Sequence, residues 1–454
     1  IVQSNGGVMS VDTACRLPVR TALSGPAAGV IAAGYIAESA GFSNVITGDM
    51  GGTSFDVSLI AGGETVLSPQ TAIDFGLVVR TPMIEIATIG AGGGSIASVD
   101  AGGLLQIGPE SAGSDPGPVA YGRGNDRPTV TDANIVLGRI DPARPLGDGL
   151  GALDLDAAQA AIRRHVAEPL GLGLMDAAEA IVRVATSAMA GAIRLVSIER
   201  GFDPERFVYM PFGGGGALHA GAMIAEVGLA RALVPRYPGV TSALGCVIAD
   251  MRQDFVQTLG AMLDELDLAA LRDRVQVHVD EGNATLNAAD TGFAAREVRV
   301  ELDMAYLGQT HTVSVPLAVG MDGATVKPVS AGAIRAAFET TYRELYGRLL
   351  TSPIRVLNLR TAVIGKRPKF DLATLAPDPG ARVETAAKGA RPIYAQGAWH
   401  EARVFDRLAL PAGARIEGPA VLEQPDATIF VEPWLAAEVD AHGNVLLTAK
   451  ESAA

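Results

Sequence analysis

The chain has 454 residues, 48% of them hydrophobic, and a formal net charge of −14 at pH 7. A chain of this length is too long to fold around one hydrophobic core, so we expect roughly two or three domains. Lys and Arg form no basic stripe, which argues against nucleic acids and membranes as partners, because both attract clustered positive charge. No uninterrupted apolar run reaches the length of about 18 residues that a membrane-spanning helix needs.

The two cysteines, Cys15 and Cys246, lie far apart in apolar contexts. This usage is typical of reduced, buried thiols and not of a disulfide framework, and it predicts a cytoplasmic protein. Residues 1–7 contain no initiator Met and no signal-peptide pattern. We therefore expect the natural protein to start upstream of this chain.

Residues 1–260 alternate short apolar runs with helical stretches, which is typical of an α/β domain. A helix is expected over 24–40, because Pro26 suits its first turn. Strands are expected at 44–48 and 55–60, and a Gly-Gly turn joins them. This region is therefore predicted as strand, turn, strand.

The segment 61–150 is dense in Gly and Pro, so loops and short strands are expected there. Apolar residues then recur at helical spacing over 181–196. Asp176, followed three residues later by Glu179, predicts a capping box at the start of this helix. The helix should be long and largely buried.

Four further elements complete the first domain in the order strand, glycine run, helix, strand. We expect them at 206–211, 213–216, 218–227 and 232–235.

The composition becomes more charged after residue 260, and an α+β domain is predicted over 261–366. We expect helices near 266–283 and 331–346 and strands near 296–303 and 311–316. Beyond this point short strands and Gly/Pro turns prevail, which predicts a small β-rich C-terminal domain over 367–454.

The strongest chemical signal is the run Gly48-Asp-Met-Gly-Gly-Thr-Ser-Phe-Asp-Val57 at the first turn between strands. Glycines there let backbone N–H groups approach phosphate oxygens, because no Cβ blocks them. We predict that the phosphates of ATP are bound by Gly51, Gly52, Thr53 and Ser54. The alternative is an ordinary hairpin whose glycines serve only the turn.

Asp49, at the end of the first strand, is the candidate catalytic residue. It is placed to hold Mg²⁺ or to orient an attacking group, because Mg²⁺ binds through one or two carboxylates plus phosphate oxygens. Asp56 is a second, weaker metal candidate.

A second glycine element precedes the helix at 218–227, and a helix N-terminus behind glycines admits a nucleotide. Its candidate nucleotide-binding residues are Gly213, Gly214, Gly215 and Gly216. Glycine runs before helices are common, so this element is weak alone. We expect a structural role for His219. Ser242 is expected to cap a helix and not to act as a nucleophile.

The first glycine turn resembles the second phosphate loop of the actin, sugar-kinase and heat-shock-chaperone ATPase fold. Several separated motifs, in order, also resemble the hydantoinase A/oxoprolinase family. These are Ser24-Gly-Pro-Ala-Ala-Gly29, the loop at 49–60, Thr88-Ile-Gly-Ala-Gly-Gly-Gly-Ser95, the run at 115–124, Thr129-Val-Thr-Asp-Ala-Asn134 and Ser242-Ala-Leu-Gly245. The resemblance continues through Gly308-Gln309, residues 342–347 and Gly418-Pro-Ala420.

This resemblance implies an actin-like ATPase domain over 1–260, incomplete at its N-terminus because the family's first phosphate loop has no counterpart in this chain. It implies a subunit of an ATP-dependent amidohydrolase that uses Mg²⁺, activates a hydantoin, 5-oxoproline or a lactam, and works with a hydantoinase B-like subunit in a hetero-oligomer. Two alternatives stay open: a subunit of an ATP-dependent acetone/acetophenone-type carboxylase, and a non-catalytic actin-like nucleotide-binding scaffold. Ala305 stands where the family pattern has a basic residue, so the resemblance does not extend to a contact made by that residue.

Overall fold

The computed structural model describes residues 1–68, 71–72, 78–79, 81–143, 151–289 and 291–450. Contacts divide the chain into two compact units. The first unit contains residues 1–24, 72–82 and 248–369, and the second contains 25–71, 83–247 and 370–454. The predicted domains follow the order of the chain, whereas these units do not. The three predicted domains, 1–260, 261–366 and 367–454, stay a prediction.

An antiparallel sheet in the order β13-β18-β14-β15 organises the first unit. Its elements are β13 (Met251–Met262), α10 (Leu268–Ala288), β14 (Ala295–Tyr306), β15 (Val313–Leu317), α11 (Ala331–Tyr346) and β18 (Ile354–Lys366). Both helices share one apolar core with the sheet, in which Val279 and Phe338 pack with Leu302. The helices and strands predicted between 261 and 366 are present, with most ends shifted by a few residues.

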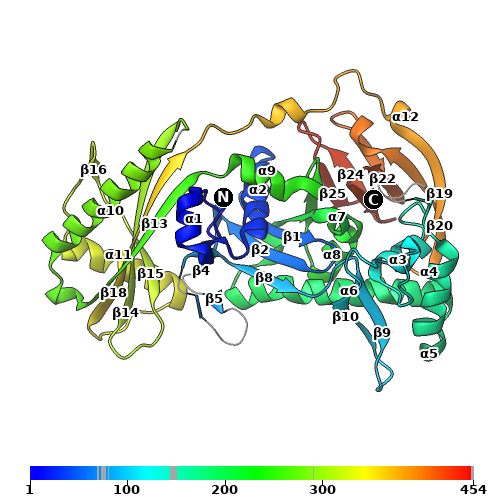
Figure 1. The fold of residues 1–454 in the computed structure, drawn as a ribbon, viewed down its shortest axis with the longest axis horizontal. Coiled ribbons are helices and arrows are strands. Elements are labelled where there is room, and N and C mark those ends of the chain that lie inside the picture. Colours follow the sequence, from blue (N-terminus) through cyan, green and yellow to red (C-terminus); the bar gives the residue numbers. More distant parts are fainter. Residues whose placement is uncertain (69–70, 73–77, 80, 144–150, 290, 451–454) are drawn as a thin grey trace. The chain divides into compact units, whose positions relative to one another are not determined.

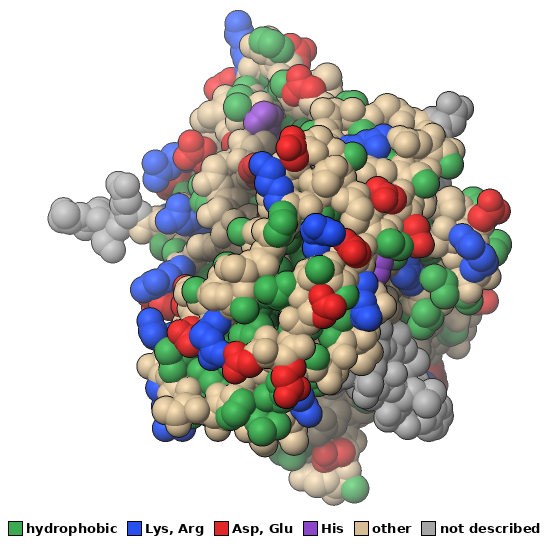
Figure 2. Space-filling model, turned by 90° about the vertical axis from the view of Figure 1, so that its left-hand side faces the viewer, with side chains coloured by type: hydrophobic (Ala, Val, Ile, Leu, Met, Phe, Trp, Pro, Cys, Tyr) green, Lys and Arg blue, Asp and Glu red, His purple; other side chains and the backbone are tan. Residues whose placement is uncertain are grey.

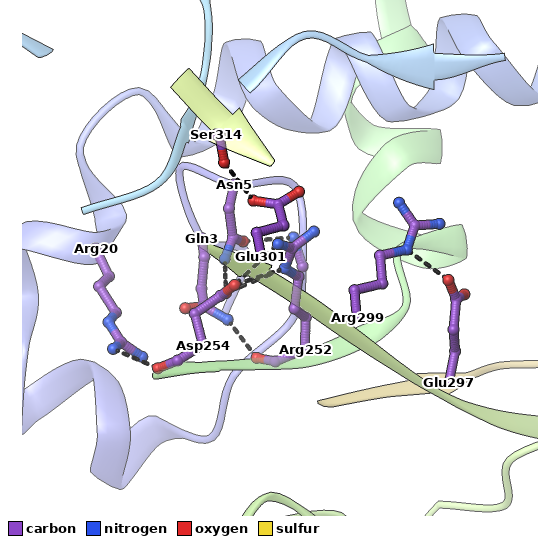
Figure 3. Close-up of polar contacts among 10 residues, drawn as sticks. Gln3, Asn5, Arg20, Arg252, Asp254, Glu297, Arg299, Glu301 and Ser314 are labelled. Carbon is purple, nitrogen blue, oxygen red and sulfur yellow. Dashed lines mark hydrogen bonds and ion pairs between the residues drawn. The ribbon is translucent and has the colours of Figure 1, made fainter. Parts of the chain in front are cut away.

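Polar contacts tie the N-terminal segment to β13 (Figure 3). The side-chain amide of Asn5 donates to the buried carboxylate of Asp254, and Arg252 donates to the same carboxylate at 2.8 Å. Arg20 donates to the backbone carbonyl of Asp254 at 3.1 Å, and Gln3 donates to that of Arg252 at 2.8 Å. A buried carboxylate needs such paired donors, so these contacts explain why the segment belongs to this unit.

Charges of both signs are interspersed on the first unit. On the face drawn in Figure 2, Lys and Arg side chains lie among Asp and Glu side chains. Arg272 pairs with Asp273 within α10 at 2.6 Å, and Arg335 of α11 pairs with Asp264, which precedes α10, at 2.8 Å. Neighbouring opposite charges cancel the long-range field that attracts polyanions.

A nine-stranded mixed sheet organises the second unit, in the order β21-β24-β25-β12-β11-β1-β2-β3, with β8 also paired to β2. Its strands are β1 (Val45–Met50), β2 (Phe55–Ala61), β3 (Glu64–Thr65), β8 (Ile86–Ile89), β11 (Val208–Phe212), β12 (Arg231–Val234), β21 (Arg415–Glu417), β24 (Leu435–Val439) and β25 (Val445–Ala449). β1, β11 and β12 pair in parallel, and the β1–β2 pair is antiparallel. The predicted order of strand, turn, strand is confirmed.

Helices cover both faces of this sheet, with α2 (Ser24–Ser39) and α6 (Leu174–Val196) on opposite sides (Figure 1). Adjacent residues of β1 enter the two cores: Val45 packs with α2, and Ile46 packs in the core of α6. Among the described residues, the helix Leu174–Arg200 alone is long and apolar enough to cross a membrane by length and composition, and 56% of its most apolar window is buried within the protein. Its apolar face lies in the core.

The predicted capping box of α6 is wrong. The helix begins after Gly173, and Asp176 and Glu179 lie inside it. Asp176 accepts a hydrogen bond from the hydroxyl of Tyr394 at 3.0 Å, and Glu179 accepts one from the N–H of Gln396 at 2.6 Å. These carboxylates hold the hairpin of β19 (Ala387–Ala395) and β20 (Ala398–Asp406), a contact between distant parts of the chain that local spacing does not reveal.

The prediction of buried thiols is also wrong, because both cysteines are free and exposed. Cys15 lies in the short helix α1 (Val11–Arg16), which buries Thr13 and Ala14, and Cys246 lies in α9 (Thr241–Ile248). A short helix at the surface buries only one side, so its apolar neighbours face solvent.

Two glycines let α2 and α9 approach closely. A Cβ at Gly245 would lie 1.8 Å from the carbonyl oxygen of Ala28, and one at Gly29 would lie 2.8 Å from Oγ of Ser242. Two of the motifs quoted above therefore meet at one helix contact, which explains why each contains glycine.

We expect Gly245→Ala to lower the free energy of unfolding by about 1–3 kcal/mol, because the added methyl group forces the helices apart. Gly191→Ala in α6 is the matched control, since a Cβ there meets nothing within 4 Å. Removing a glycine from a helix interior should stabilise by about 0.5–1 kcal/mol. Urea unfolding of both variants checks the pair, and an equal response of the two would contradict the close approach.

Candidate active site

The β1–β2 turn exposes the residues predicted to bind phosphate. Gly51, Gly52 and Thr53 are exposed, and Ser54 is half-buried. The N–H of Gly51 donates to the carbonyl of Ser54 at 3.1 Å. Within the described part of the chain, the N–H groups of Gly52 and Thr53 have no acceptor. Such unpaired backbone donors are what an anionic ligand needs.

The loop at residues 90–95 braces this turn. The N–H groups of Gly93 and Gly94 donate to the carbonyls of Gly51 and Gly52, at 3.0 and 2.6 Å. In a planar trans peptide the N–H points opposite to the carbonyl, so the N–H groups of Gly52 and Thr53 point away from the loop. A Cβ at Gly92 would lie 2.6 Å from the backbone nitrogen of Thr53. The glycines of this loop are therefore required for the brace.

A cavity of about 630 Å³ opens beside the turn. Its lining includes Gly51, Gly52 and Thr53 from the first predicted glycine element and Gly214 and Gly215 from the second. Among the described residues, the lining does not include Ser54, Asp49, Asp56, Gly213 or Gly216. The volume lies within the range of about 300–1,000 Å³ that is usual for small-molecule sites.

The second glycine element forms the short helix α7 (Gly213–Gly216) directly after β11. β11 lies parallel to β1, with Phe212 paired to Asp49, so the two glycine elements meet at neighbouring strand ends. Gly213 has a φ of +76°, and a Cβ there would lie 2.4 Å from Oδ1 of Asp49. Only glycine suits this position, because the backbone is left-handed and the carboxylate is close.

Asp49 lies directly across from Asp56 in the β1–β2 pair, and the hydroxyl of Ser242 donates to its Oδ2 at 3.4 Å. Burial and the negative charge of Asp56 raise the pKa of Asp49 from 3.8 to about 6. The hydrogen bond from Ser242 acts in the opposite direction and lowers this pKa. Burial also raises the pKa of Asp56, whereas a hydrogen bond of 2.5 Å from the hydroxyl of Thr88 lowers it. Ser242, predicted as a helix cap, thus contacts the candidate catalytic carboxylate.

The paired carboxylates fit a divalent cation. Like charges opposite each other on neighbouring strands repel, and a cation relieves that repulsion. Within the described residues, no group of three or more His, Cys, Asp and Glu side chains could hold a metal ion by itself. Two carboxylates that share their ion with phosphate oxygens are the arrangement that Mg²⁺ prefers over an all-protein cage.

Residues from distant segments complete the cavity, and the sequence reasoning missed them. They include Tyr121, Thr131 and Asp426. Thr131 lies in α3 (Val130–Val136), inside a motif quoted above, so the motif itself was the available signal. Asp426 lies in the turn between β22 (Ala420–Gln424) and β23 (Ala427–Val431), and nothing local distinguishes it from an ordinary turn aspartate.

His219 has the predicted structural role. It is buried, its Nδ1 lies 3.3 Å from the hydroxyl of Thr186, and burial, with the charge of Arg139, lowers its pKa to about 3. A histidine held neutral in this way packs in the core and does not exchange protons near neutral pH.

Comparison with known proteins identifies close relatives along the whole chain. Residues 1–255 match the family model described as Hydantoinase/oxoprolinase, and residues 279–451 match the Hydantoinase/oxoprolinase C-terminal domain. The caprolactamase subunit alpha of Pseudomonas jessenii is 36% identical, over 98% of this chain and 64% of that protein. The acetophenone carboxylase gamma subunit of Aromatoleum aromaticum is 32% identical, over 100% of this chain and 62% of that protein.

The crystal structure of the ATP-dependent caprolactamase from Pseudomonas jessenii has the same fold, with a TM-score of 0.83 and 34% identity over 99% of this chain and 65% of that chain. The chain spans less than two thirds of the length of these relatives. Family models match most of the chain, on either side of residues 256–278. The chain therefore belongs to the hydantoinase/oxoprolinase family.

Proposed function

We propose that this chain is the ATP-cleaving subunit of an amidohydrolase that activates a cyclic amide, such as a lactam, hydantoin or 5-oxoproline, for ring opening. The observation that carries the proposal is the meeting of both glycine elements at one cavity beside the Asp49–Asp56 pair. The similarity to a caprolactamase subunit and to the solved ATP-dependent caprolactamase supports this reaction class.

The second unit supplies an ATPase of the actin, sugar-kinase and heat-shock-chaperone type in this proposal. The antiparallel β1–β2 turn carries the phosphate-binding N–H groups of Gly52 and Thr53, and α7 carries the second glycine element. Ser54, Gly213 and Gly216 are not among the lining residues that the structure describes and support these two elements in the proposal. Fold resemblance alone does not license a function, so the proposal depends on this geometry.

Each candidate residue then has a defined task. The N–H groups of the turn bind phosphate oxygens, which positions ATP for transfer of a phosphoryl group to the amide oxygen. Asp49 and Asp56 would hold Mg²⁺, which neutralises charge on the phosphates when it is bound. Asp49, half-buried at the strand end, also orients the attacking oxygen.

A hydantoinase B-like subunit completes the hydrolysis of the activated amide in this proposal, within a cytoplasmic hetero-oligomer. Support comes from the relatives, which are themselves named as subunits alpha and gamma.

The test is ATP turnover by the natural-length protein together with its partner subunit. We expect caprolactam, a hydantoin or 5-oxoproline to stimulate phosphate release at least about 10-fold, because correct substrate binding completes the site. Stimulation by acetone or acetophenone with bicarbonate, and by none of the amides, would favour the carboxylase alternative, which the similarity to acetophenone carboxylase keeps open. Binding of Mg-ATP in calorimetry without turnover on any of these compounds would favour the scaffold alternative, and failure to bind Mg-ATP would overturn the proposed ATP site.

A further inference from the structure

Asp426 reaches the cavity from the C-terminal part of the chain. It lies in the β22–β23 turn and, with Pro425, lines the cavity next to α7. A Cβ at Gly214 would lie 3.9 Å from the carbonyl oxygen of Asp426, so this turn and the second glycine element are neighbours. The lining of the cavity therefore includes an acidic residue that binding of phosphate does not explain, because phosphate and carboxylate repel.

A buried arginine fixes the orientation of this side chain. Arg407, in the short helix η11 (Arg407–Ala409), is 3% exposed and donates to the carbonyl of Val234 at 3.2 Å and to Oε1 of Gln424. A guanidinium has only donors, so the amide oxygen of Gln424 must face it, and the amide nitrogen must face away. That nitrogen donates to Oδ1 of Asp426.

A backbone group holds the other carboxylate oxygen. The N–H of Gly239 donates to Oδ2 of Asp426 at 2.8 Å, and a Cβ at Gly239 would lie 2.8 Å from that oxygen. Each carboxylate oxygen offers about two acceptor positions, and each uses one within the protein. Among the described residues each oxygen has this one hydrogen-bond partner, so the carboxylate keeps capacity for about one further donor on each oxygen.

Two adjacent acceptors on one rigid carboxylate match two adjacent hydroxyl donors. In a nucleotide those donors are the 2′- and 3′-hydroxyls of ribose, which lies between the phosphates and the base. Acidic side chains recognise ribose hydroxyls in this way in dinucleotide-binding folds. A carboxylate beside the glycine element that faces the nucleotide is well placed for the same contact.

We propose that Asp426, positioned by Arg407 and Gln424, accepts the ribose hydroxyls of the bound nucleotide and makes the site selective for ribonucleotides. This inference rests on the proposed ATP site and adds a specificity residue to it. Gln424 is a positioning residue, because it acts only through Asp426.

The experiment compares Mg-ATP with its 2′,3′-dideoxy analogue by calorimetry, using the natural-length protein with its partner subunit. The unmodified protein should bind ATP about 10- to 100-fold more tightly than the analogue, the usual range for hydrogen bonds to a charged acceptor. Asp426→Ala should lose most of this preference by weakening ATP binding alone, with the affinity for the analogue unchanged. Gln424→Leu should show the same pattern with a smaller loss.

Asp378→Ala is the matched control, because Asp378 also accepts one backbone N–H, from Gly380 at 2.8 Å, in an exposed turn that does not line the cavity. It should change neither affinity. Equal weakening of both nucleotides in Asp426→Ala would overturn the inference in favour of a purely structural turn, as would an unchanged preference. If the unmodified protein binds neither nucleotide, the proposed ATP site fails together with the inference; if it binds both equally, only the inference fails.

Discussion

Asp49→Asn is expected to abolish ATP turnover while it raises the stability of the folded protein. In the proposed site, removing the carboxylate removes one of the two groups that would hold Mg²⁺ and leaves Asp56 as the remaining acid of the pair. Loss of such a residue typically lowers turnover by about 100-fold or more. The side chains of Asp and Asn have the same shape, so the fold has no reason to change.

The stability gain follows from the raised pKa of Asp49. Its folded value of about 6 lies above the ordinary 3.8, so the folded protein binds a proton more readily than the unfolded chain. Stability therefore falls as pH rises from about 4 to about 6, and the full cost persists above that window. The rise in pKa corresponds to at most about 3 kcal/mol at pH 7. Asn carries no charge, so the variant avoids this cost.

Urea unfolding without nucleotide at pH 7 and at pH 4, together with phosphate release at pH 7, checks both halves. The variant should be more stable at pH 7 and should match the unmodified protein at pH 4. Asp56→Asn is the comparison, because it relieves the repulsion and should lower the pKa of Asp49. Retained turnover in Asp49→Asn would remove this residue from the mechanism, and an equal stability difference at both pH values would show that its charge costs nothing.

Local patterns predicted the elements that local physics determines. The helix expected near 331–346 is α11, whose buried residues Ile334, Phe338 and Tyr342 recur at helical spacing and whose first turn is capped by Ser330. The β1–β2 turn followed from a glycine pair between two apolar runs. The paired position of Asp49 and Asp56 follows from the register of that hairpin once its turn is known.

Contacts between distant segments were beyond the reach of the sequence. Asp426 enters the cavity because β22 and β23 turn beside α7, and its own neighbours, Pro425 and Ala427, give no sign of this. Asp176 and Glu179 have the spacing of a helix cap but bind a hairpin more than 200 residues later, with separations of 218 and 217 residues. When the hydrogen-bond partner of a polar side chain lies far away in the sequence, local spacing does not reveal the role of that side chain.

The contact between Gly213 and Asp49 can be separated from backbone strain by two matched substitutions. Gly213 and Gly201 both have left-handed backbones, with φ of +76° and +82°. A Cβ at Gly201 meets nothing within 4 Å, whereas one at Gly213 would lie 2.4 Å from Oδ1 of Asp49 and 2.5 Å from the carbonyl oxygen of Met50. Gly201→Ala should therefore cost only the strain of about 1–2 kcal/mol, with ATP turnover kept.

Gly213→Ala should lower the free energy of unfolding by that strain and by roughly a further 1–3 kcal/mol. The further loss arises because a packed site accepts an extra methyl group only when its neighbours move. The groups that move are the candidate catalytic carboxylate and the strand end that carries it, so ATP turnover should fall at least about 10-fold. Urea unfolding and phosphate release measured on both variants separate the two effects. Equal loss of stability with turnover intact in both would mean that Asp49 does not depend on its glycine neighbour, and the close approach of the two strand ends would then have no role in catalysis.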